Sequence, residues 1–285
     1  MSAGNPAALF KKLEFGVDEY RSAIHAVLAR RMAHEPERMM TPQLKRNLSG
    51  FVNRFERFYQ PIYLSYGSGV QCPICRWTGR AFVKRSAPNK PADSFICPSC
   101  RSSERHRLAY FVLKDRLPNY AEKTLHFAPE SCIEPWLRTI SKEYLSVDLS
   151  SKAAMEHMDI TDLRLPDDTF SLLWCSHVLE HIENDRKAMA ELFRVLRPSG
   201  LAVIMVPVYG ETTYENPEVK SPAERLKHFR QADHVRLYGV DIKTRLQETG
   251  FKVDVRRVSD LALESVNTHL LNYPSTKELF LCIKP

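Results

Sequence analysis

Two cysteine pairs are the residues of this sequence whose types and spacing point most directly to chemistry. Cys72-Pro-Ile-Cys75 and Cys97-Pro-Ser-Cys100 each place two thiols within one tight turn, and 21 residues separate the pairs. Four thiolates in a tetrahedron form the usual structural zinc site, which has no open position for catalysis. A redox dithiol is the competing interpretation, but there are two pairs and neither follows a thioredoxin-like strand. We therefore predict that Cys72, Cys75, Cys97 and Cys100 hold a structural Zn²⁺.

Polar residues follow three predicted strands in the second half of the chain. Apolar runs at 143–147 and 170–175 have the length and residue types of buried strands, and a shorter run precedes Asp159. Ligands of open α/β sheets bind beyond the carboxyl ends of the parallel strands. His177 would face such a pocket and is a candidate general base. The end of the strand at 170–175 therefore places Cys175, Ser176 and His177 on the rim of the expected pocket.

A second candidate for chemistry is the segment 231–239, which holds an acid, an imidazole and a cation within a few residues. Asp233 beside His234 would suit the removal of a proton from an attacking hydroxyl or amine. The alternative is that the two residues cap a helix predicted over 240–249. The segment ends a long stretch, 208–236, that shows no clear repeat and is typical of a lid over a substrate.

The elements that must position these residues alternate between strand and helix. A helix predicted to open at Ser176 carries an apolar stripe and stops at 198–200. With strands at 170–175 and 201–206 it makes a right-handed βαβ unit of a parallel sheet. The stripe consists of Ala188, Leu192, Val195 and Leu196. The other predicted strands are 124–128, 143–147, the short run before Asp159, 251–258 and 278–283.

The second half of the chain resembles a known enzyme family. The residues that carry the resemblance are D-x-F, then V-L-E-H, then E-L-x-R-V-L-R-P-x-G, all within residues 165–207. They are similar to the middle of the class I S-adenosylmethionine (SAM)-dependent methyltransferases, of the type 11-like group, and the likeness extends over residues 123–285. The resemblance implies an α/β, Rossmann-like, seven-stranded methyltransferase fold whose last strand is antiparallel. It also implies in-line transfer of the sulfonium methyl group to a nucleophile.

The resemblance further implies where the cofactor SAM lies. The loop after the first strand is usually glycine-rich in the family, whereas residues 128–131 of this chain, APES, contain no glycine. A small Ala128 still allows close approach, and Glu130 would accept a hydrogen bond from the ammonium group of SAM. The implied cofactor-binding residues are Phe127, Ala128, Pro129 and Glu130 in the first loop, Asp148 for the ribose, Asp159 and Ile160 for the adenine, and Cys175 and Ser176 at the rim.

The composition of the chain is that of an ordinary globular protein. Of its 285 residues 44% are hydrophobic and 26% are charged, and no apolar run approaches the roughly 20 residues that span a bilayer. The first residues lack the pattern of a secretory signal, so we expect a cytoplasmic protein with reduced thiols and no membrane partner.

Three regions are predicted, and positive charge is concentrated in the middle one. They are a helical N-terminal region (1–66), a zinc ribbon with a connecting helix (67–120) and the methyltransferase domain (121–285). The helical pattern over 7–58 is interpreted as a cap or dimer arm, so a homodimer is possible, with substrate gating as the alternative. Residues 67–120 carry 10 Lys and Arg against 3 Asp and Glu. Within them Arg105, His106 and Arg107 either contact a phosphate or carboxylate or begin a solvated helix.

The function that we predict is methyl transfer to an O or N nucleophile of a small molecule, such as a metabolite, natural product or sugar. The lid-like stretch with its histidine favours this class. An RNA methyltransferase that uses the basic zinc ribbon to bind nucleic acid is the first alternative. A non-catalytic scaffold with a SAM-type fold is the second, because the first loop has no glycine.

Overall fold

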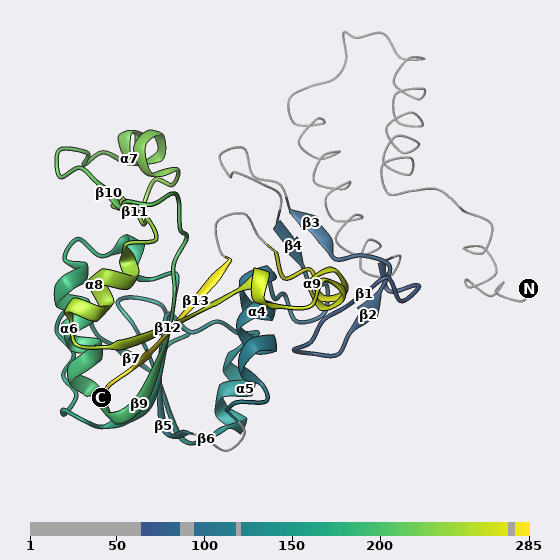
Figure 1. Cartoon of the computed structure of the whole chain (residues 1–285), viewed down its shortest axis with the longest axis horizontal. Helices are drawn as coiled ribbons and strands as arrows, with labels where there is room; N and C mark the ends of the chain where they lie inside the picture. Colours follow the sequence, from purple (N-terminus) through teal and green to yellow (C-terminus); the bar gives the residue numbers. More distant parts are fainter. Residues whose placement is uncertain (1–63, 86–93, 118–120, 273–276) are drawn as a thin grey trace, which may run out of the picture. The chain divides into compact units, whose positions relative to one another are not determined.

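The computed structural model describes residues 64–85, 94–117, 121–272 and 277–285, all within one compact unit, residues 60–285 (Figure 1). The helical pattern predicted over 7–58, and the dimer arm inferred from it, lie outside the described residues. Among the residues that are described, no helix has both the length and the apolar character needed to cross a membrane.

A seven-stranded sheet forms the centre of the fold, in the order β12-β13-β9-β8-β5-β6-β7. Neighbouring strands are parallel from β7 to β9, and β13 is antiparallel to both β9 and β12. This confirms the predicted Rossmann-like methyltransferase sheet with an antiparallel last strand. The strands are β5 (Ala121–Phe127), β6 (Ser141–Asp148), β7 (Glu156–His157), β8 (Phe170–Ser176), β9 (Leu196–Met205), β12 (Lys252–Arg257) and β13 (Glu278–Ile283).

Helices cover both faces of the sheet, as alternation along its strands requires. Successive side chains of β9 point to opposite faces, so Ala202 and Ile204 join one core cluster while Val203 and Met205 join the other. The first cluster lies under α6 and α8, and the second under α4, α5 and α9 (Figure 1). These helices are α4 (Glu104–Leu113), α5 (Glu134–Thr139), α6 (Asp185–Val195), α8 (Ile242–Glu248) and α9 (Leu263–His269), and a short 3-10 helix, η3 (Val258–Asp260), precedes α9.

The helix predicted to open at Ser176 begins later than expected. Ser176 is the last residue of β8, and His177 turns the chain with a positive φ of 55°. A 3-10 turn, η2 (Leu179–His181), follows, and α6 starts only at Asp185, where the Asn184 side chain accepts a hydrogen bond from the Lys187 amide. The prediction was therefore wrong about residues 176–184: Ser176 ends β8, and residues 177–184 form an irregular bend beyond it.

The cysteine-bearing region folds as two small hairpins followed by α4. β1 (Val70–Gln71) pairs with β2 (Thr78–Gly79), and β3 (Val83–Arg85) pairs with β4 (Ser94–Ile96). Arg107 of α4 is fully buried, and it donates to backbone carbonyls of the cysteine-bearing region and of the end of α9. Those acceptors are Phe95, Ser102, His269 and Leu270. Arg107 therefore fastens the ribbon to α4 and α9, and it is neither a phosphate ligand nor part of a solvated helix.

The stretch 208–236, predicted as a lid, has regular structure of its own. It contains β10 (Tyr214–Glu215) and α7 (Pro222–Phe229), and β10 pairs with β11 (Arg236–Leu237) at the end of the stretch. The helix α8 is preceded by Asp241, so Asp233 and His234 do not cap it.

Candidate active site

The four cysteine sulfurs converge at one point. Their Sγ atoms all lie within 4.8 Å of one another, with 3.7 Å between Cys72 and Cys100 and between Cys75 and Cys97. Sulfurs at the corners of a tetrahedron around an ion about 2.3 Å away would be about 3.8 Å apart. The cluster therefore has the dimensions that a four-thiolate zinc site needs, and none of the four forms a disulfide.

The two knuckles repeat one backbone design. In each, the residue after the second cysteine has a positive φ, 61° at Arg76 and 67° at Arg101, and its amide donates to the carbonyl of the first cysteine. The amide of the first cysteine in turn donates to the carbonyl of the residue two positions beyond the second cysteine, Trp77 for Cys72 and Ser102 for Cys97. This turn aims both sulfurs of each pair inward, as the spacing predicted.

The predicted cofactor residues lie at the carboxyl ends of β5, β6, β7 and β8. Ala128 has a φ of 48°, so the loop after β5 adopts the left-handed conformation that glycine usually supplies. Asp148 ends β6, and its Oδ1 accepts from the amides of Ser150 and Ser151 at 2.8 and 2.7 Å. Asp159 Oδ1 accepts from the Thr161 amide at 2.8 Å. In both aspartates one carboxylate oxygen shapes the local turn, and among the described residues the second makes no hydrogen bond.

The remaining predicted cofactor residues differ in accessibility. Phe127 and Cys175 are buried, with 3% and 1% of their surfaces exposed, and Ile160 is buried at 5%. Burial raises the pKa of the Cys175 thiol well above its ordinary value, so it stays protonated. These side chains support the pocket edge from below, whereas Pro129 and Glu130 are partly exposed.

The Glu130 carboxylate already accepts several hydrogen bonds from the protein itself. Its Oε1 accepts from His106 Nε2 (2.7 Å), Ser176 Oγ (3.1 Å) and Arg105 Nη2 (3.2 Å), and its Oε2 accepts from Trp174 Nε1 (3.1 Å). Burial opposes ionisation, but the charges and hydrogen bonds of His106 and Arg105 lower the pKa of Glu130 below its usual range. A carboxylate has about four acceptor positions, so this one is nearly saturated by the protein. The role of Glu130 toward an ammonium group stays a prediction.

His126 supports the same loop from underneath. Its Nε2 accepts from the Glu130 amide at 3.4 Å and its Nδ1 lies 2.8 Å from the Tyr144 hydroxyl. Because Nε2 is an acceptor, the ring is neutral and carries its proton on Nδ1. Burial lowers the pKa of His126 to about 4, which keeps the ring in this form.

The predicted bases lie in one cluster of imidazoles and carboxylates beside the end of β8. His177 Nδ1 lies 3.1 Å from Glu180 Oε1, and the His181 and His234 rings are 4.8 Å apart. His234 is 1% exposed and contacts Gln231 at 2.7 Å, whereas the exposed Asp233 lies against His181. The carboxylate-held imidazole expected at Asp233–His234 is therefore found at Glu180–His177.

Burial governs the charge state of these histidines. It lowers the pKa of His177 and, separately, that of His234, so both rings are neutral near pH 7. Burial by itself would raise the pKa of Glu180. The nearby His177 has the larger effect and lowers this pKa below its usual value, so the carboxyl is ionised.

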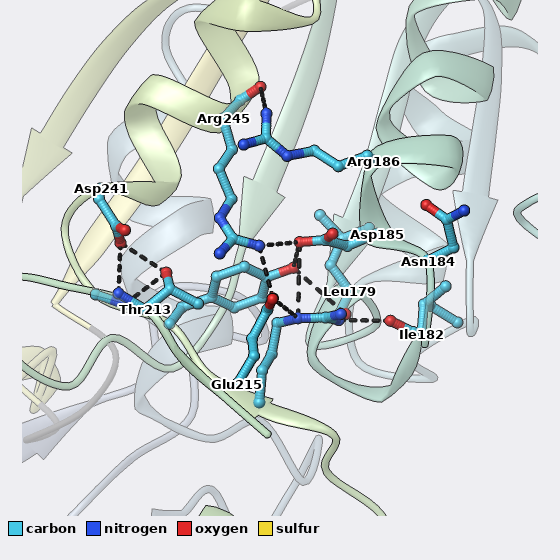
Figure 2. Close-up of polar contacts among 12 residues, drawn as sticks. Leu179, Ile182, Asn184, Asp185, Arg186, Thr213, Glu215, Asp241 and Arg245 are labelled. Carbon is cyan, nitrogen blue, oxygen red and sulfur yellow. Dashed lines mark hydrogen bonds and ion pairs between the residues drawn. The ribbon is translucent and has the colours of Figure 1, made fainter. Parts of the chain in front are cut away.

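A polar network fixes the bend that carries this cluster. Figure 2 shows the side chains of Asp185, Glu215 and Arg245 pointing toward one another. Asp185 Oδ2 accepts from the Tyr238 hydroxyl at 2.7 Å and from Arg245 at 3.1 Å, and Glu215 Oε1 accepts from Arg236 and Arg245. Arg236 also donates to the carbonyls of Leu179, Ile182 and Glu183. The stretch 208–238 is thus tied to η2 and to the start of α6.

Comparison with known proteins identifies the domain. Residues 130–204 match the family model described as a methyltransferase domain, about a quarter of the chain. This part of the chain, residues 130–204, is similar to a methyltransferase domain. The matched residues run from the Glu130 loop through β9, so the pocket edge described above lies within or next to the methyltransferase match. No curated protein matches the chain at significant similarity.

Solved structures resemble the methyltransferase domain at low sequence identity. The YcgJ protein of Bacillus subtilis is 16% identical, covering 63% of this chain and 98% of that one, with a TM-score of 0.43. A SAM-dependent methyltransferase of Mesorhizobium loti is 15% identical, covering 62% and 98%, with a TM-score of 0.46. A Burkholderia thailandensis N1-methyltransferase is 15% identical, covering 63% and 78%, with a TM-score of 0.44.

The carboxylate contact that the sequence offered for Arg105 and His106 is found at Glu130. Sequence reasoning missed Trp174, which reaches Glu130 from β8, and Glu180, which joins His234 across 54 positions. The signal that might have found Glu180 is its place in the V-L-E-H pattern, one turn beyond β8. Nothing in the spacing of Asp185, Glu215 and Arg245 indicated that they would meet.

Proposed function

We propose that this methyltransferase transfers the methyl group of SAM to an oxygen or nitrogen nucleophile of a small-molecule acceptor. The observation that carries the proposal is the line of polar groups at the carboxyl ends of β5, β6, β7 and β8, next to a structured insertion that supplies an imidazole cluster. Bound SAM would supply an electrophilic methyl group. The protein's own contribution is to orient the two reactants and to accept a proton.

Asp148 and Asp159 are proposed to bind the nucleoside. Each has one carboxylate oxygen committed to its own loop and a second oxygen available to a ligand, so the loop is rigid before binding. In this proposal Asp148 accepts from the ribose hydroxyls and Asp159, with the Ile160 backbone, binds the adenine. The left-handed Ala128 lets the backbone approach the methionine part.

His177 is the proposed proton acceptor. Of the two candidate histidines it has the more exposed side chain, 19% against a nearly inaccessible His234. Glu180 orients the ring through Nδ1 and favours the imidazolium that forms when the ring takes a proton. Asp233 and His234 would then support the cluster and would not touch the acceptor.

Zn²⁺ in the four-cysteine cluster is proposed to be structural. Four thiolates leave no coordination position for a substrate, and the cluster joins hairpins too short to be stable alone. Through α4 the ribbon also supports the Glu130 loop, since Arg105 and His106 belong to the helix that follows the second knuckle.

The decisive test is calorimetric titration of the full chain with S-adenosylhomocysteine. Removing the second oxygen by Asp148→Asn should weaken binding at least tenfold, because hydrogen bonds to a charged group contribute about 1.5–3 kcal/mol. Asp254→Asn, on β12 and away from the pocket edge, is the matched control and should bind like the unchanged protein. No binding by the unchanged protein would leave the scaffold alternative as the function.

Methylation of RNA is the second candidate, and a surface hollow favours it. A hollow of about 420 Å³ beside the first knuckle is lined by Arg76 and Lys114 together with Tyr110 and Phe111. Cations and aromatic rings together suit phosphates and unstacked bases. The residues that line the hollow are not those of the pocket edge of the sheet. In this candidate the hollow would bind RNA, and methyl transfer would take place elsewhere, at the pocket edge. Binding of a short single-stranded RNA that weakens steeply with salt, and is lost in Arg76→Ala, would favour this candidate over the first.

A further inference from the structure

Glu180, His181 and His234 bring three metal-binding groups together outside the zinc ribbon. Each offers one ligand atom, and the three atoms lie within 4.8 Å of one another. Glu180 and His181 belong to η2 at the end of β8, and His234 comes from the insertion. A carboxylate and two imidazoles form a set that divalent transition metals bind well.

Two members of this set are buried without the partners that buried polar groups require. Glu180 and His234 are each 1% exposed. Among the described residues, no hydrogen bond of good geometry reaches either Glu180 carboxylate oxygen or Nδ1 of His234. His177 Nδ1 approaches Glu180 Oε1 to 3.1 Å, an ion-pair distance, which still leaves Oε2 unpartnered. A buried anion in this state costs several kcal/mol unless a cation joins it.

The neighbours of both imidazoles leave the correct nitrogen available. His181 Nδ1 lies 3.1 Å from the Asp233 carbonyl oxygen, to which it must donate, so Nε2 keeps its lone pair. The Gln231 side-chain amide lies 2.7 Å from His234 Nε2. When the oxygen of this amide faces the ring it accepts from Nε2–H, and Nδ1 then has the lone pair for a ligand. Metal-bound histidines commonly have their other nitrogen fixed by a carbonyl or an amide in this way.

The backbone holds the three groups at a fixed separation. The Val235 amide donates to the Glu180 carbonyl at 3.0 Å, which joins the residue after His234 to Glu180 itself. Arg236, nearly fully buried, adds hydrogen bonds to the Leu179 and Glu183 carbonyls on either side. The insertion is therefore fastened to η2 on both sides of the cluster, so the site does not depend on a loop closing.

We propose that Glu180, His181 and His234 bind a divalent transition-metal ion such as Zn²⁺, Mn²⁺ or Co²⁺. Two imidazoles make Mg²⁺ a poor occupant, because it prefers oxygen ligands only. Three protein ligands leave coordination positions open, as in catalytic metal sites. If the proposed methyltransferase function holds, an oxygen of the acceptor would take an open position, and the metal would lower the pKa of an acceptor hydroxyl. The acceptor class would then be a hydroxyl compound.

The test uses the full chain with its cysteine cluster already loaded with Zn²⁺, titrated with Co²⁺. We expect weak visible d–d absorption without the intense near-ultraviolet bands of cobalt thiolate, at one ion per chain. The absorption should be lost in Glu180→Gln and in His234→Ala and kept in His228→Ala, which removes an exposed imidazole from the same insertion. No such absorption in the unchanged protein, or equal absorption in all three variants, would overturn the proposal.

The metal site and the methyltransferase function fail in different ways. Binding of S-adenosylhomocysteine by a protein that takes up no Co²⁺ beyond the cysteine cluster refutes the metal site alone. Uptake of one Co²⁺ without binding of S-adenosylhomocysteine supports the metal site and refutes the methyltransferase function. Circular dichroism of each variant establishes that a lost signal reflects a lost ligand and not an unfolded chain.

Discussion

Glu130 and Glu180 are carboxylates beside the same pocket edge, with side chains 12% and 1% exposed, and their surroundings are opposite. Glu130 accepts hydrogen bonds from Arg105, His106, Trp174 and Ser176. Glu180 has the approach of His177 and, within the described part of the chain, no hydrogen bond of good geometry. The donors around Glu130 compensate its negative charge, so this carboxylate stabilises the fold. The charge of Glu180 has little compensation from the protein, so this carboxylate can bind a positively charged ligand.

The largest expected effect is at Glu130. Glu130→Gln removes the negative charge that accepts hydrogen bonds from His106 and the partly exposed Arg105. It should lower the free energy of unfolding by about 2–4 kcal/mol, because a hydrogen bond to a charged group contributes about 1.5–3 kcal/mol. Urea denaturation measures the change. Glu134→Gln, which affects a more exposed pair with Arg138, should change the free energy by under about 1 kcal/mol. Similar losses in the two variants would show that Glu130 is not a structural centre.

Lowering the pH should reduce the stability of the protein through His126, which supports the Glu130 loop, before Glu130 itself is protonated. The folded-state pKa of His126 is about 4, below the ordinary value of 6.5, so the unfolded chain binds the extra proton first. Stability from this residue is complete above pH 6.5 and falls, by up to about 3 kcal/mol, as the pH drops to 4. Denaturation at several pH values should show a shallower slope in His126→Gln. An unchanged slope would mean that His126 is not held neutral.

A much smaller effect is expected at Glu180. In protein freed of metal at the histidine cluster, Glu180→Gln should raise the free energy of unfolding, by up to about 1 kcal/mol, since it removes a buried charge that only the approach of His177 offsets. The same urea experiment that is used for Glu130 measures it. A loss as large as that of Glu130→Gln would erase the contrast and make Glu180 a structural residue.

The smallest effect concerns the loop that both regions border. Ala128 has a left-handed backbone, so Ala128→Gly should relieve strain and raise the free energy of unfolding by no more than about 1 kcal/mol. Ala153→Gly, in an exposed turn without a positive φ, should lower it slightly, because glycine adds freedom to the unfolded chain. Thermal melts of the two variants that shift in the same direction would contradict this.

Much of the fold could be predicted because its signals are local. The strand at 278–283 matched β13 residue for residue, and the two cysteine pairs met as their spacing predicted. The bend after β8 could not be predicted as well. Nothing in the local residue pattern marked the turn at His177, the 3-10 helix η2 or the extended Ile182, which together delay the start of α6 to Asp185.

By itself the sequence determined the sheet, the cysteine cluster and the methyltransferase resemblance, since each depends on residues that are close together in the chain or on a regular period. Only the tertiary structure decided which carboxylate is satisfied. The partners of Glu130 lie up to 46 positions away, and Glu180 meets His234 through a hydrogen bond network centred on Arg236. Burial and hydrogen-bond partners are properties of the folded chain, and they separate a carboxylate that supports structure from one that can bind a ligand.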